Sequence, residues 1–586
     1  MIQWRSWGAD ALAEARTRDR LILLSLSAVW CHWCHVMDET TYSDDEVIGF
    51  INANFIPIRV DADMRPDIDT LYNQGGWPST AILTPDGEVI SGGNYLEPEE
   101  LLARLRRALA LYRSDRESIS RGIEERKTLK EMRRSRKEGA RRLPDRNDAH
   151  EIARVLEEAF DEKYGGFGSG QKFPNPDAIS FLLSLYAKEH DEGIRHIVTK
   201  TLDRMAQSAL MDEREGGFFR YATKPDWSVP HYEKMLEVNA GMIANYADAG
   251  RAFANRTYLG IVRKTFAYVQ KDLSDPATGA FFGSQDADEA YYRAKDRSGM
   301  KPPSIDRTVY SDSSSLMISA LVKAYGATGE KEYLDRARLC ADFLLKSLFT
   351  VQDGAYHYYR AGERHLPGLL SDNELFGAAL LDLYDETGTR DYEQKAREIG
   401  RLLLGKYFDK ADNRFRLSRS NALTKPAAEG VLFDMNGNLA NYRALRFLSR
   451  LAYYEQIDNL QAVRDAALLS LSPEYRKFAP SAGAFGTVLL WTAFDPVRIT
   501  ILVGKAGSRT YLDAVRSVFI PEKAVRVLSL LTDAEEIKKL GYAPRESVYV
   551  CAGKRCSKPL SRNEDLMRTL RDFTKETKRQ PPLQTK

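Results

Sequence analysis

The sequence predicts a multidomain chain: an α/β N-terminal domain, an all-α toroid of the (α/α)6 type and a small C-terminal α/β appendage. An apolar run at 21–29 leads directly into a Cys-X-X-Cys pair, which favours a strand followed by a helix. Helical periodicity fills the middle of the chain between recurring turns, and three short apolar runs follow it. The 586 residues exceed what one hydrophobic core holds. The expected units are 1–112, a charged helical linker at 113–145, the toroid at 146–495, and 496–586.

Composition excludes several classes of partner. The formal net charge is +2, with 43% hydrophobic and 29% charged residues, so we expect no nucleic acid as partner. No apolar stretch approaches the roughly 18 residues of a membrane span, so we expect no membrane partner. Five cysteines in 586 residues are too few for a disulfide framework. At the N-terminus, charged residues stand where a secretory signal would have its apolar segment. We therefore expect a reducing, cytoplasmic compartment.

The N-terminal elements follow a known order. After the strand at 21–29 and the Cys-X-X-Cys helix, "FIPIRVDAD" is typical of a strand, and "GGWPSTAIL" places Pro78 directly before another. "TPDG" indicates a hairpin, and "EPEELLARLRRALALY" indicates a closing amphipathic helix. This order is that of thioredoxin. It predicts a cis Trp77–Pro78 peptide bond facing the cysteines.

Cys31 and Cys34 are the first candidate catalytic pair. The helix N-terminus would stabilise a Cys31 thiolate. His32 and His35 have three readings that stay open: exposed helix residues, groups that lower the pKa of Cys31, or part of a zinc site. Ser25 stands where thioredoxins keep a buried acid, which argues against a general disulfide reductase.

The segment at 113–142 holds twelve Lys or Arg against six acids and few apolar positions. We interpret it as a solvated helix between domains rather than a nucleic-acid patch.

The central region repeats one kind of turn. In each turn, polar or acidic residues are followed by a Gly or Asn and then by aromatic residues, as in "DEKYGGFG", "DEREGGFF" and "DPATGAFF". The turns recur at intervals of about 50 to 75 residues. This spacing suits helical hairpins closed into a toroid, with inner helices around a core and loops forming a pocket. An open α-solenoid is the alternative.

Polar clusters between these turns are candidate pocket residues. "VPHYEKML" contains His231 and Glu233, "GSQDADEAYY" contains Asp286 and Asp288, and "GQKFP" contains Lys172. Carboxylates with a histidine could serve glycoside hydrolysis or sugar epimerisation. The alternative for each cluster is capping and hydrogen bonding at a helix terminus.

The C-terminal segment predicts three strands separated by helices, in "VRITILVG", "AVRVLSLL" and "SVYVCAG". Cys551 and Cys556 lie five residues apart. Together with Cys31 and Cys34 they could bind zinc or relay thiols, or they could be unrelated loop cysteines.

Several motifs carry a resemblance to a known family. "CHWCHVM", "RPDID", "GGWP", "LTPDG", "GGFG", "KFPNP", "VPHYEKML" and "DADE" resemble the thioredoxin-domain family of spermatogenesis-associated protein 20 and bacterial YyaL-type proteins. The resemblance implies a thioredoxin-like domain fused to a six-hairpin toroid akin to N-acylglucosamine 2-epimerases and six-hairpin glycosidases. The sequence differs from the family's usual pattern at "TLYNQ", "EAYYRAKDRSGMK" and "GQKFP".

Three hypotheses for the function follow. The first is a thiol–disulfide oxidoreductase with Cys31 as nucleophile, Cys34 resolving, and Pro78 shaping a groove for a protein disulfide. The second is a carbohydrate-active toroid that binds a sugar-like small molecule, with the thioredoxin-like domain as a regulatory partner. The third is a zinc-binding scaffold, zinc being the one cofactor that the cysteines suggest. We rank the redox hypothesis first.

Overall fold

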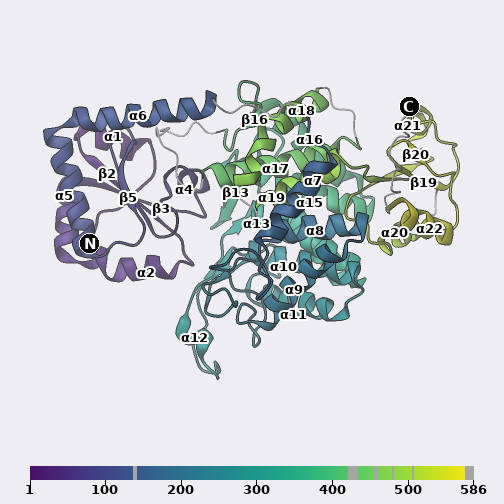
Figure 1. Ribbon diagram of the computed structural model, residues 1–586, viewed down its shortest axis with the longest axis horizontal. Coiled ribbons are helices and arrows are strands. Elements are labelled where there is room, and N and C mark those ends of the chain that lie inside the picture. Colours follow the sequence, from purple (N-terminus) through teal and green to yellow (C-terminus); the bar gives the residue numbers. More distant parts are fainter. Residues whose placement is uncertain (136–141, 420–432, 455–458, 478–480, 505–506, 575–586) are drawn as a thin grey trace, which may run out of the picture.

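The computed structural model describes residues 1–135, 142–419, 433–454, 459–477, 481–504 and 507–574. Three units follow one another along the molecule, with the N-terminal α/β domain at one end and the C-terminal α/β unit at the other (Figure 1). The helical unit lies between them. The predicted fold class is confirmed.

The N-terminal domain is a three-layer α/β/α sandwich around a five-stranded sheet with the order β1-β3-β2-β4-β5. Strands β1, β3 and β2 run parallel, while β4 and β5 are antiparallel to their neighbours. Helices α1 and α4 cover one face, and α2, α3 and α5 cover the other. The elements are β1 (Arg5–Ser6), α1 (Ala9–Thr17), β2 (Leu21–Ser27), α2 (His32–Glu39), α3 (Asp45–Asn54), β3 (Phe55–Asp61), α4 (Pro66–Tyr72), β4 (Ser79–Leu83), β5 (Val89–Gly93) and α5 (Pro98–Ser114).

The predicted linker differs from a free solvated helix. Helix α6 (Arg116–Ser135) buries Ile119 in the core of the thioredoxin-like domain, and Arg126 donates to the backbone oxygen of Val89 at 2.7 Å. Its first turns therefore extend that domain. Residues 136–141 of the predicted linker lie outside the described residues.

The middle unit is a closed double ring of helices. The inner helices are α8 (Pro176–Glu189), α10 (Leu236–Ala252), α13 (Ser311–Thr328), α15 (Leu370–Thr387), α17 (Phe433–Leu451) and α19 (Ala482–Thr492). The outer helices are α7 (Arg146–Ala159), α9 (Glu192–Gln207), α11 (Arg256–Asp272), α14 (Lys331–Ser347), α16 (Arg390–Leu402) and α18 (Leu460–Leu471). Each inner helix packs on the next, and α19 packs on α8, which closes the ring.

Glycine makes the closing contact between α19 and α8 possible. A Cβ atom at Gly483 would lie 2.4 Å from the Cα atom of Ala178, closer than any side chain tolerates. The two helices therefore pack backbone to backbone at this point. The ring closes through this contact, so the open solenoid is excluded.

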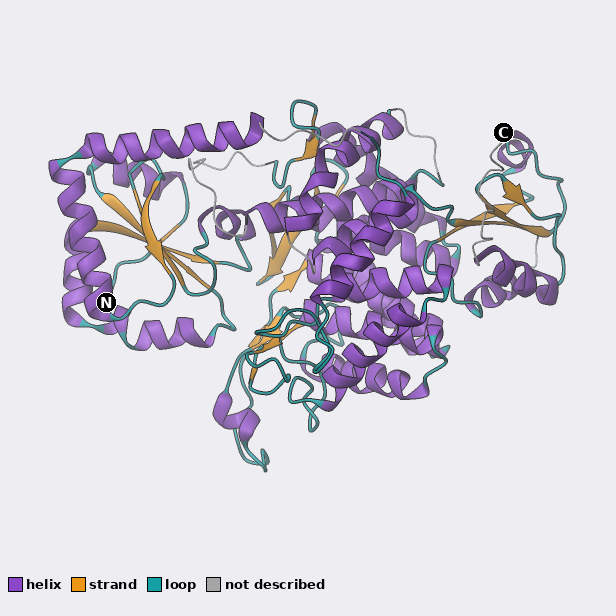
Figure 2. Cartoon of the chain, viewed as in Figure 1, coloured by secondary structure: helices purple, strands orange, loops and turns teal. Residues whose placement is uncertain are grey.

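Short strands and loops lie at the end of the ring where the inner helices begin, between the helices and the N-terminal domain (Figure 2). In three of these helices, Asn239, Asn373 and Asn441 each accept a backbone N–H of the segment that precedes the helix, at 2.7 to 2.9 Å. These amides attach the preceding strands and loops to the helices. The short elements are β6 (Tyr221–Ala222), β7 (Pro230–His231), β8 (Lys234–Met235), β9 (Ser284–Gln285), α12 (Glu289–Arg293), β10 (Ile305–Asp306), β11 (Val309–Tyr310), β12 (Phe349–Thr350), β13 (Gly354–Arg360), β14 (Glu363–Pro367), β15 (Phe408–Asp409) and β16 (Arg414–Phe415).

The C-terminal unit is a four-stranded sheet with the order β18-β17-β19-β20, and it contains the three predicted strands. It packs on the ends of the inner helices: Arg251 of α10 donates to the backbone oxygen of Val518 at 2.9 Å, and Arg516 pairs with Glu386 of α15. Its elements are β17 (Val497–Val503), α20 (Arg509–Arg516), β18 (Lys523–Ser529), α21 (Ala534–Lys539), β19 (Ser547–Ala552), β20 (Arg555–Cys556) and α22 (Asn563–Thr574).

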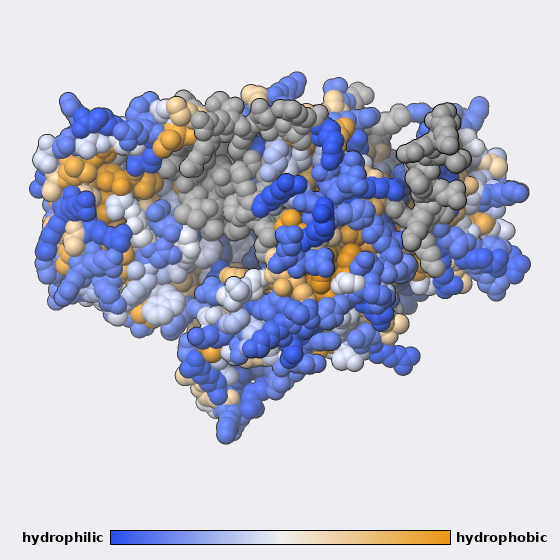
Figure 3. Space-filling view, in the orientation of Figure 1, coloured by the Kyte–Doolittle hydropathy of each residue, from blue (hydrophilic) through white to orange (hydrophobic). Residues whose placement is uncertain are grey.

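Among the described residues, no helix combines the length and the apolar composition that a membrane crossing needs. The face in Figure 3 is predominantly hydrophilic over the C-terminal unit and much of the toroid.

Candidate functional site

The thioredoxin-like domain covers the end of the toroid at which the inner helices begin. Nε2 of His357, on β13, donates to the backbone oxygen of Asp63 at 2.6 Å. A hydrophobic cluster joins Trp30, Cys31 and Cys34 to Met235 at the start of α10. The two cysteines therefore face the toroid rather than open solvent.

Cys31 and Cys34 form a disulfide, with their Cα atoms 5.2 Å apart. Cys31 is the N-cap of α2, and its Sγ accepts the backbone N–H of Cys34 at 3.2 Å. Both are only 3% exposed. The Trp77–Pro78 peptide bond is cis, and Trp77 packs on the same hydrophobic cluster as the cysteines. The predicted thioredoxin arrangement is thus present, with Ser25 buried in β2.

The two histidines of the motif lie in different surroundings. His32 lines the cavity described below. His35 donates through Nε2 to the backbone oxygen of Val29 at 2.9 Å and lies 3.3 Å from Oδ2 of Asp286. The hydrogen bond to Asp286 raises the pKa of His35, although partial burial opposes its charge. His35 and Asp286 therefore join the thioredoxin-like domain to the toroid.

Arg220 lies over Trp30 and Trp77, two residues of the hydrophobic cluster that contains the disulfide. Its guanidinium carbon is 4.3 Å from the ring centre of Trp30 and 5.0 Å from that of Trp77. Its backbone N–H donates to the backbone oxygen of Glu233 at 2.9 Å, which fixes the loop that carries it. Within the described chain, the guanidinium forms no ion pair.

A cavity of about 2890 Å³ runs through the centre of the toroid. Trp30, Cys31 and His32 line one end, and residues 519–523 of the C-terminal unit line the other. Leu129 and Phe173, which are exposed to solvent, also line it, so the cavity is open between α6 and the loop before α8. Its walls are the inner helices. This volume exceeds the roughly 300–1,000 Å³ of an ordinary ligand site.

Four carboxylates line the end of the cavity that faces Cys31, and two of them, Glu233 and Glu374, are buried. The other two are Glu237 and Asp312. Burial raises the pKa of Glu237 and Asp312, and it raises the pKa of Glu374 well above its ordinary value. Oε2 of Glu233 and Oε1 of Glu374 are buried without a hydrogen-bond partner in the described chain. Nδ1 of His231 lies 3.4 Å from Oε1 of Glu233. Groups of this kind can exchange protons with a bound ligand.

His357 and Asp312 line the cavity, and suitable ligand atoms of His357, Asp312 and Asp372 lie within 4.8 Å of one another. Nδ1 of His357 contacts Oδ1 of Asp372 at 2.9 Å, and its Nε2 contacts the backbone oxygen of Asp63. Burial opposes a charge on His357, but the carboxylates of Asp372 and Asp312 outweigh it and raise the pKa to about 10. Both ring nitrogens therefore act as donors, which leaves none to ligate a metal ion.

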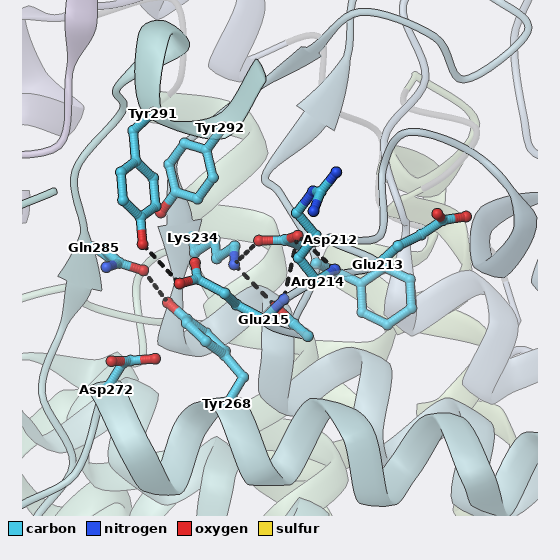
Figure 4. A network of polar contacts seen from close by, with 12 residues as sticks. Asp212, Glu213, Arg214, Glu215, Lys234, Tyr268, Asp272, Gln285, Tyr291 and Tyr292 are labelled. Atoms are coloured by element: carbon cyan, nitrogen blue, oxygen red, sulfur yellow. Dashed lines mark hydrogen bonds and ion pairs between the residues drawn. The ribbon is translucent and has the colours of Figure 1, made fainter. Parts of the chain in front are cut away.

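Lys234, inside the VPHYEKML motif, is completely buried and does not line the cavity. Its Nζ lies 2.7 Å from Oδ2 of Asp212 and 4.3 Å from the ring centre of Tyr268 (Figure 4). Arg297 pairs with Asp212 at 2.9 Å and with Glu215 at 3.0 Å. This network ties the turn at 212–217 to β8 and to the segment that carries Asp286.

The structure separates the predicted pocket residues. His231 and Glu233 line the cavity. Lys172 does not: it is buried, and its Nζ binds Oδ2 of Asp161 at 2.8 Å and the backbone oxygen of Gly168. Asp286 contacts His35, and Asp288 caps α12 by accepting the N–H of Tyr291 at 2.8 Å. For Asp288 the capping alternative is thus what the structure shows.

The proposed four-cysteine zinc site is not assembled. Cys551 and Cys556 form their own disulfide across β19 and β20. The C-terminal unit lies at the end of the molecule opposite to Cys31 and Cys34 (Figure 1). The toroid separates the two pairs, so they cannot share a metal ion or relay thiols directly. Cys340 is buried in the core as a free thiol.

Arg220, Asp63 and His357 are residues that the sequence analysis did not select. Trp30 donates through Nε1 to Oδ2 of Asp63 at 2.6 Å, and burial raises the pKa of this acid well above its ordinary value. The "DAD" at the end of β3 was a local signal for Asp63. Arg220 comes from a loop of the toroid and His357 from β13, and no spacing links them to the cysteines.

Comparisons with known proteins find a family match at the N-terminus and a relative of nearly the whole chain. Residues 1–130 match a family described as "Protein of unknown function, DUF255". An uncharacterized protein of Caenorhabditis elegans is 24% identical over 98% of this chain and 95% of its own length. Spermatogenesis-associated protein 20 of Homo sapiens is 31% identical over 49% of this chain, and that match covers 39% of the human protein.

Solved structures show a lower similarity. A D-mannose isomerase has a TM-score of 0.46 at 12% identity, covering 58% of this chain and 96% of that one. A sugar epimerase from a ruminal bacterium has a TM-score of 0.45 at 12% identity, covering 56% and 87%. The fold rests on the closed ring described above. With the N-terminal match and the relatives in worm and human, the chain's resemblance to the thioredoxin-domain family of spermatogenesis-associated protein 20 is confirmed.

Proposed function

We propose that the protein is a thiol–disulfide oxidoreductase in which Cys31 is the attacking thiolate and Cys34 the resolving thiol. The observation that carries the proposal is the position of Cys31, at the N-terminus of α2 and on the wall of the large cavity. The helix N-terminus favours the thiolate. His35, whose pKa is raised by Asp286, adds positive charge to the same helix. Pro78 belongs to the loop that flanks the pair.

The exchange needs no further reagent than a thiol or a disulfide. The Cys31 thiolate attacks an incoming disulfide RSSR, forms the mixed disulfide and releases one RS⁻. Cys34 then attacks Sγ of Cys31, closes the Cys31–Cys34 bond and releases the second RS⁻. Two electrons pass from the dithiol to RSSR, and the two thiol protons end on the two RSH products. The reverse reaction oxidises two RSH.

The test follows the fluorescence of the reduced protein, because Trp30 adjoins Cys31. We expect 2-hydroxyethyl disulfide to oxidise the wild-type protein. The fluorescence change of Cys31→Ser with the same reagent should be at least 10³-fold slower. Cys34→Ser should stop at a mixed disulfide, which peptide mass mapping places on Cys31. The double variant Cys551→Ser/Cys556→Ser is the matched control and should react like wild type. An unchanged rate in Cys31→Ser would refute the proposal.

A second candidate, a carbohydrate-active toroid, is favoured by the unpartnered buried oxygens of Glu233 and Glu374 on the cavity wall. A carboxyl with a raised pKa, as for Glu374, is suited to general acid catalysis beside an ionised carboxylate. We expect Glu374→Gln to lower the turnover of a sugar substrate at least 100-fold. The free energy of unfolding should be the same as for the wild-type protein. Absence of turnover by the wild-type protein across a broad saccharide panel would eliminate this candidate.

A further inference from the structure

We propose that the substrate of Cys31 and Cys34 is a low-molecular-weight disulfide or thiol that carries a carboxylate, that it binds inside the toroid cavity, and that Arg220 binds its carboxylate. This inference rests on the proposed redox function. It adds the class of substrate, the route to the cysteines and a residue that determines specificity.

Access to the cysteines limits the size of the substrate. Cys31 and Cys34 are 3% exposed, and Trp30 is 2% exposed. A protein disulfide needs room for an extended backbone beside the attacking sulfur, and that room adjoins Trp30 and Trp77. The guanidinium of Arg220 occupies it. While the domain is docked, a folded protein therefore cannot present a disulfide to Cys31.

The cavity offers the remaining route. Cys31 and His32 lie on its wall, and it opens beside the exposed side chains of Leu129 and Phe173. Its volume of about 2890 Å³ accommodates a small molecule with room to spare. The substrate can thus approach Cys31 from the toroid side without separation of the domains.

The charge beside Cys31 indicates the chemistry of the substrate. Two arginines of the inner helices that also line the cavity are paired: Arg443 contacts Asp177 at 3.0 Å, and Arg450 contacts Asp385 at 2.7 Å. Arg220 has no such partner in the described chain. Its planar guanidinium stacks on two indole rings, which leaves its N–H edge for a carboxylate. Paired N–H donors bind a carboxylate in a fixed orientation.

Two acids, Asp69 and Glu237, interact with the charge of Arg220 without forming an ion pair with it in the described chain. Burial raises the pKa of Asp69 to about 6 and raises the pKa of Glu237, while Arg220 lowers both. Asp69 also accepts the indole N–H of Trp77 at 3.0 Å, so its carboxylate is directed at that ring. A substrate carboxylate would complete the pairing of Arg220 next to the reacting sulfur.

The experiment compares the rates at which three disulfide probes oxidise the reduced full-length protein. Glutathione disulfide carries carboxylates, 2-hydroxyethyl disulfide is neutral, and cystamine is cationic. Each rate is divided by the rate of the same probe with dithiothreitol, which removes intrinsic reactivity. We expect glutathione disulfide to exceed the neutral probe at least tenfold and cystamine to be the slowest.

Variants of Arg220 test whether this residue causes the preference for probes that carry carboxylates. Arg220→Met should lower the normalised rate of glutathione disulfide at least tenfold and leave the neutral probe within twofold. Arg220→Lys should keep part of the preference because the charge remains. Arg416→Met is the matched control, since Arg416 also lines the cavity but pairs with Asp409 at 2.9 Å, and it should change nothing.

The outcomes separate this inference from the function on which it rests. If no probe oxidises the dithiol, the redox function itself is wrong. If all probes react at equal normalised rates and Arg220→Met changes none of them, the redox function stands and the carboxylate site is wrong. Reduction of insulin as fast as reduction of the small probes would overturn the restriction to small substrates.

Discussion

Replacing Lys234 with methionine lowers the free energy of unfolding of the toroid by about 3 kcal/mol, because the change leaves a buried carboxylate with one partner fewer. Lys234 is 0% exposed, and Asp212 is nearly as buried. Methionine retains the length of the side chain but neither the ion pair nor the cation–π contact with Tyr268. Arg297 still contacts Asp212, which keeps the loss at the lower end of the range for buried pairs. The measurement is the urea midpoint of the toroid transition at unchanged slope.

Lys200→Met is the matched control. Lys200 contacts Glu162 at 2.7 Å, but that carboxylate is 70% exposed, and such surface pairs contribute about 0 to 1 kcal/mol. Equal losses in the two variants would mean that the buried network of Figure 4 adds nothing beyond a surface pair. Asp212→Asn in the Lys234→Met background should recover part of the loss, since it removes the uncompensated charge.

Local signals explain why the N-terminal domain and the number of helical hairpins could be predicted. The strands β2, β3 and β4 are apolar runs bounded by turn residues, and the hairpin before β5 follows "TPDG". Strand β1 has only two residues, Arg5 and Ser6, and its place is set by pairing with β3, so no period reveals it. Ring closure is likewise non-local, because it depends on the contact of Gly483 with Ala178 across some 300 residues.

The site shows the same division between local and distant information. Cys31, Cys34 and Pro78 were predictable because their spacing and the neighbouring strands carry the signal. Arg220 and His357 were not, since their contacts join segments that are far apart in sequence. Residues were selected wrongly for the cavity where a polar side chain near a helix start serves the fold itself, as with Lys172 in its ion pair and Asp288 at its cap. Ion pairing and capping use the same residue types as catalysis.

Raising the pH from 7 to 10 destabilises the junction between the thioredoxin-like domain and the toroid through His357. Its folded pKa of about 10 exceeds the ordinary 6.5, so between these values the folded protein holds one proton more than the unfolded chain. Stability from this group is fully present below pH 6.5 and is lost as the pH rises through about 10. At about 1.4 kcal/mol per pH unit, the loss between pH 7 and pH 10 is about 4 kcal/mol.

Comparison with His357→Gln isolates this contribution from the other groups that titrate at high pH. At pH 7 the variant should be less stable by about 4 kcal/mol, because Asp372 and Asp312 lose their buried counter-charge. The difference between wild type and variant should narrow toward pH 10, since above pH 6.5 only the folded wild-type protein holds the imidazole proton and binding that proton becomes less favourable as the pH rises. His150→Gln, which removes an exposed contact with Glu189, should leave a small difference that does not follow pH in this way. A large difference for His357→Gln that stays constant from pH 7 to 10 would mean that His357 is neutral in the folded protein and supports the junction by packing alone. A narrowing difference means that the charge on His357 holds Asp63, and with it the strand end beside Trp30 and Cys31, against the toroid.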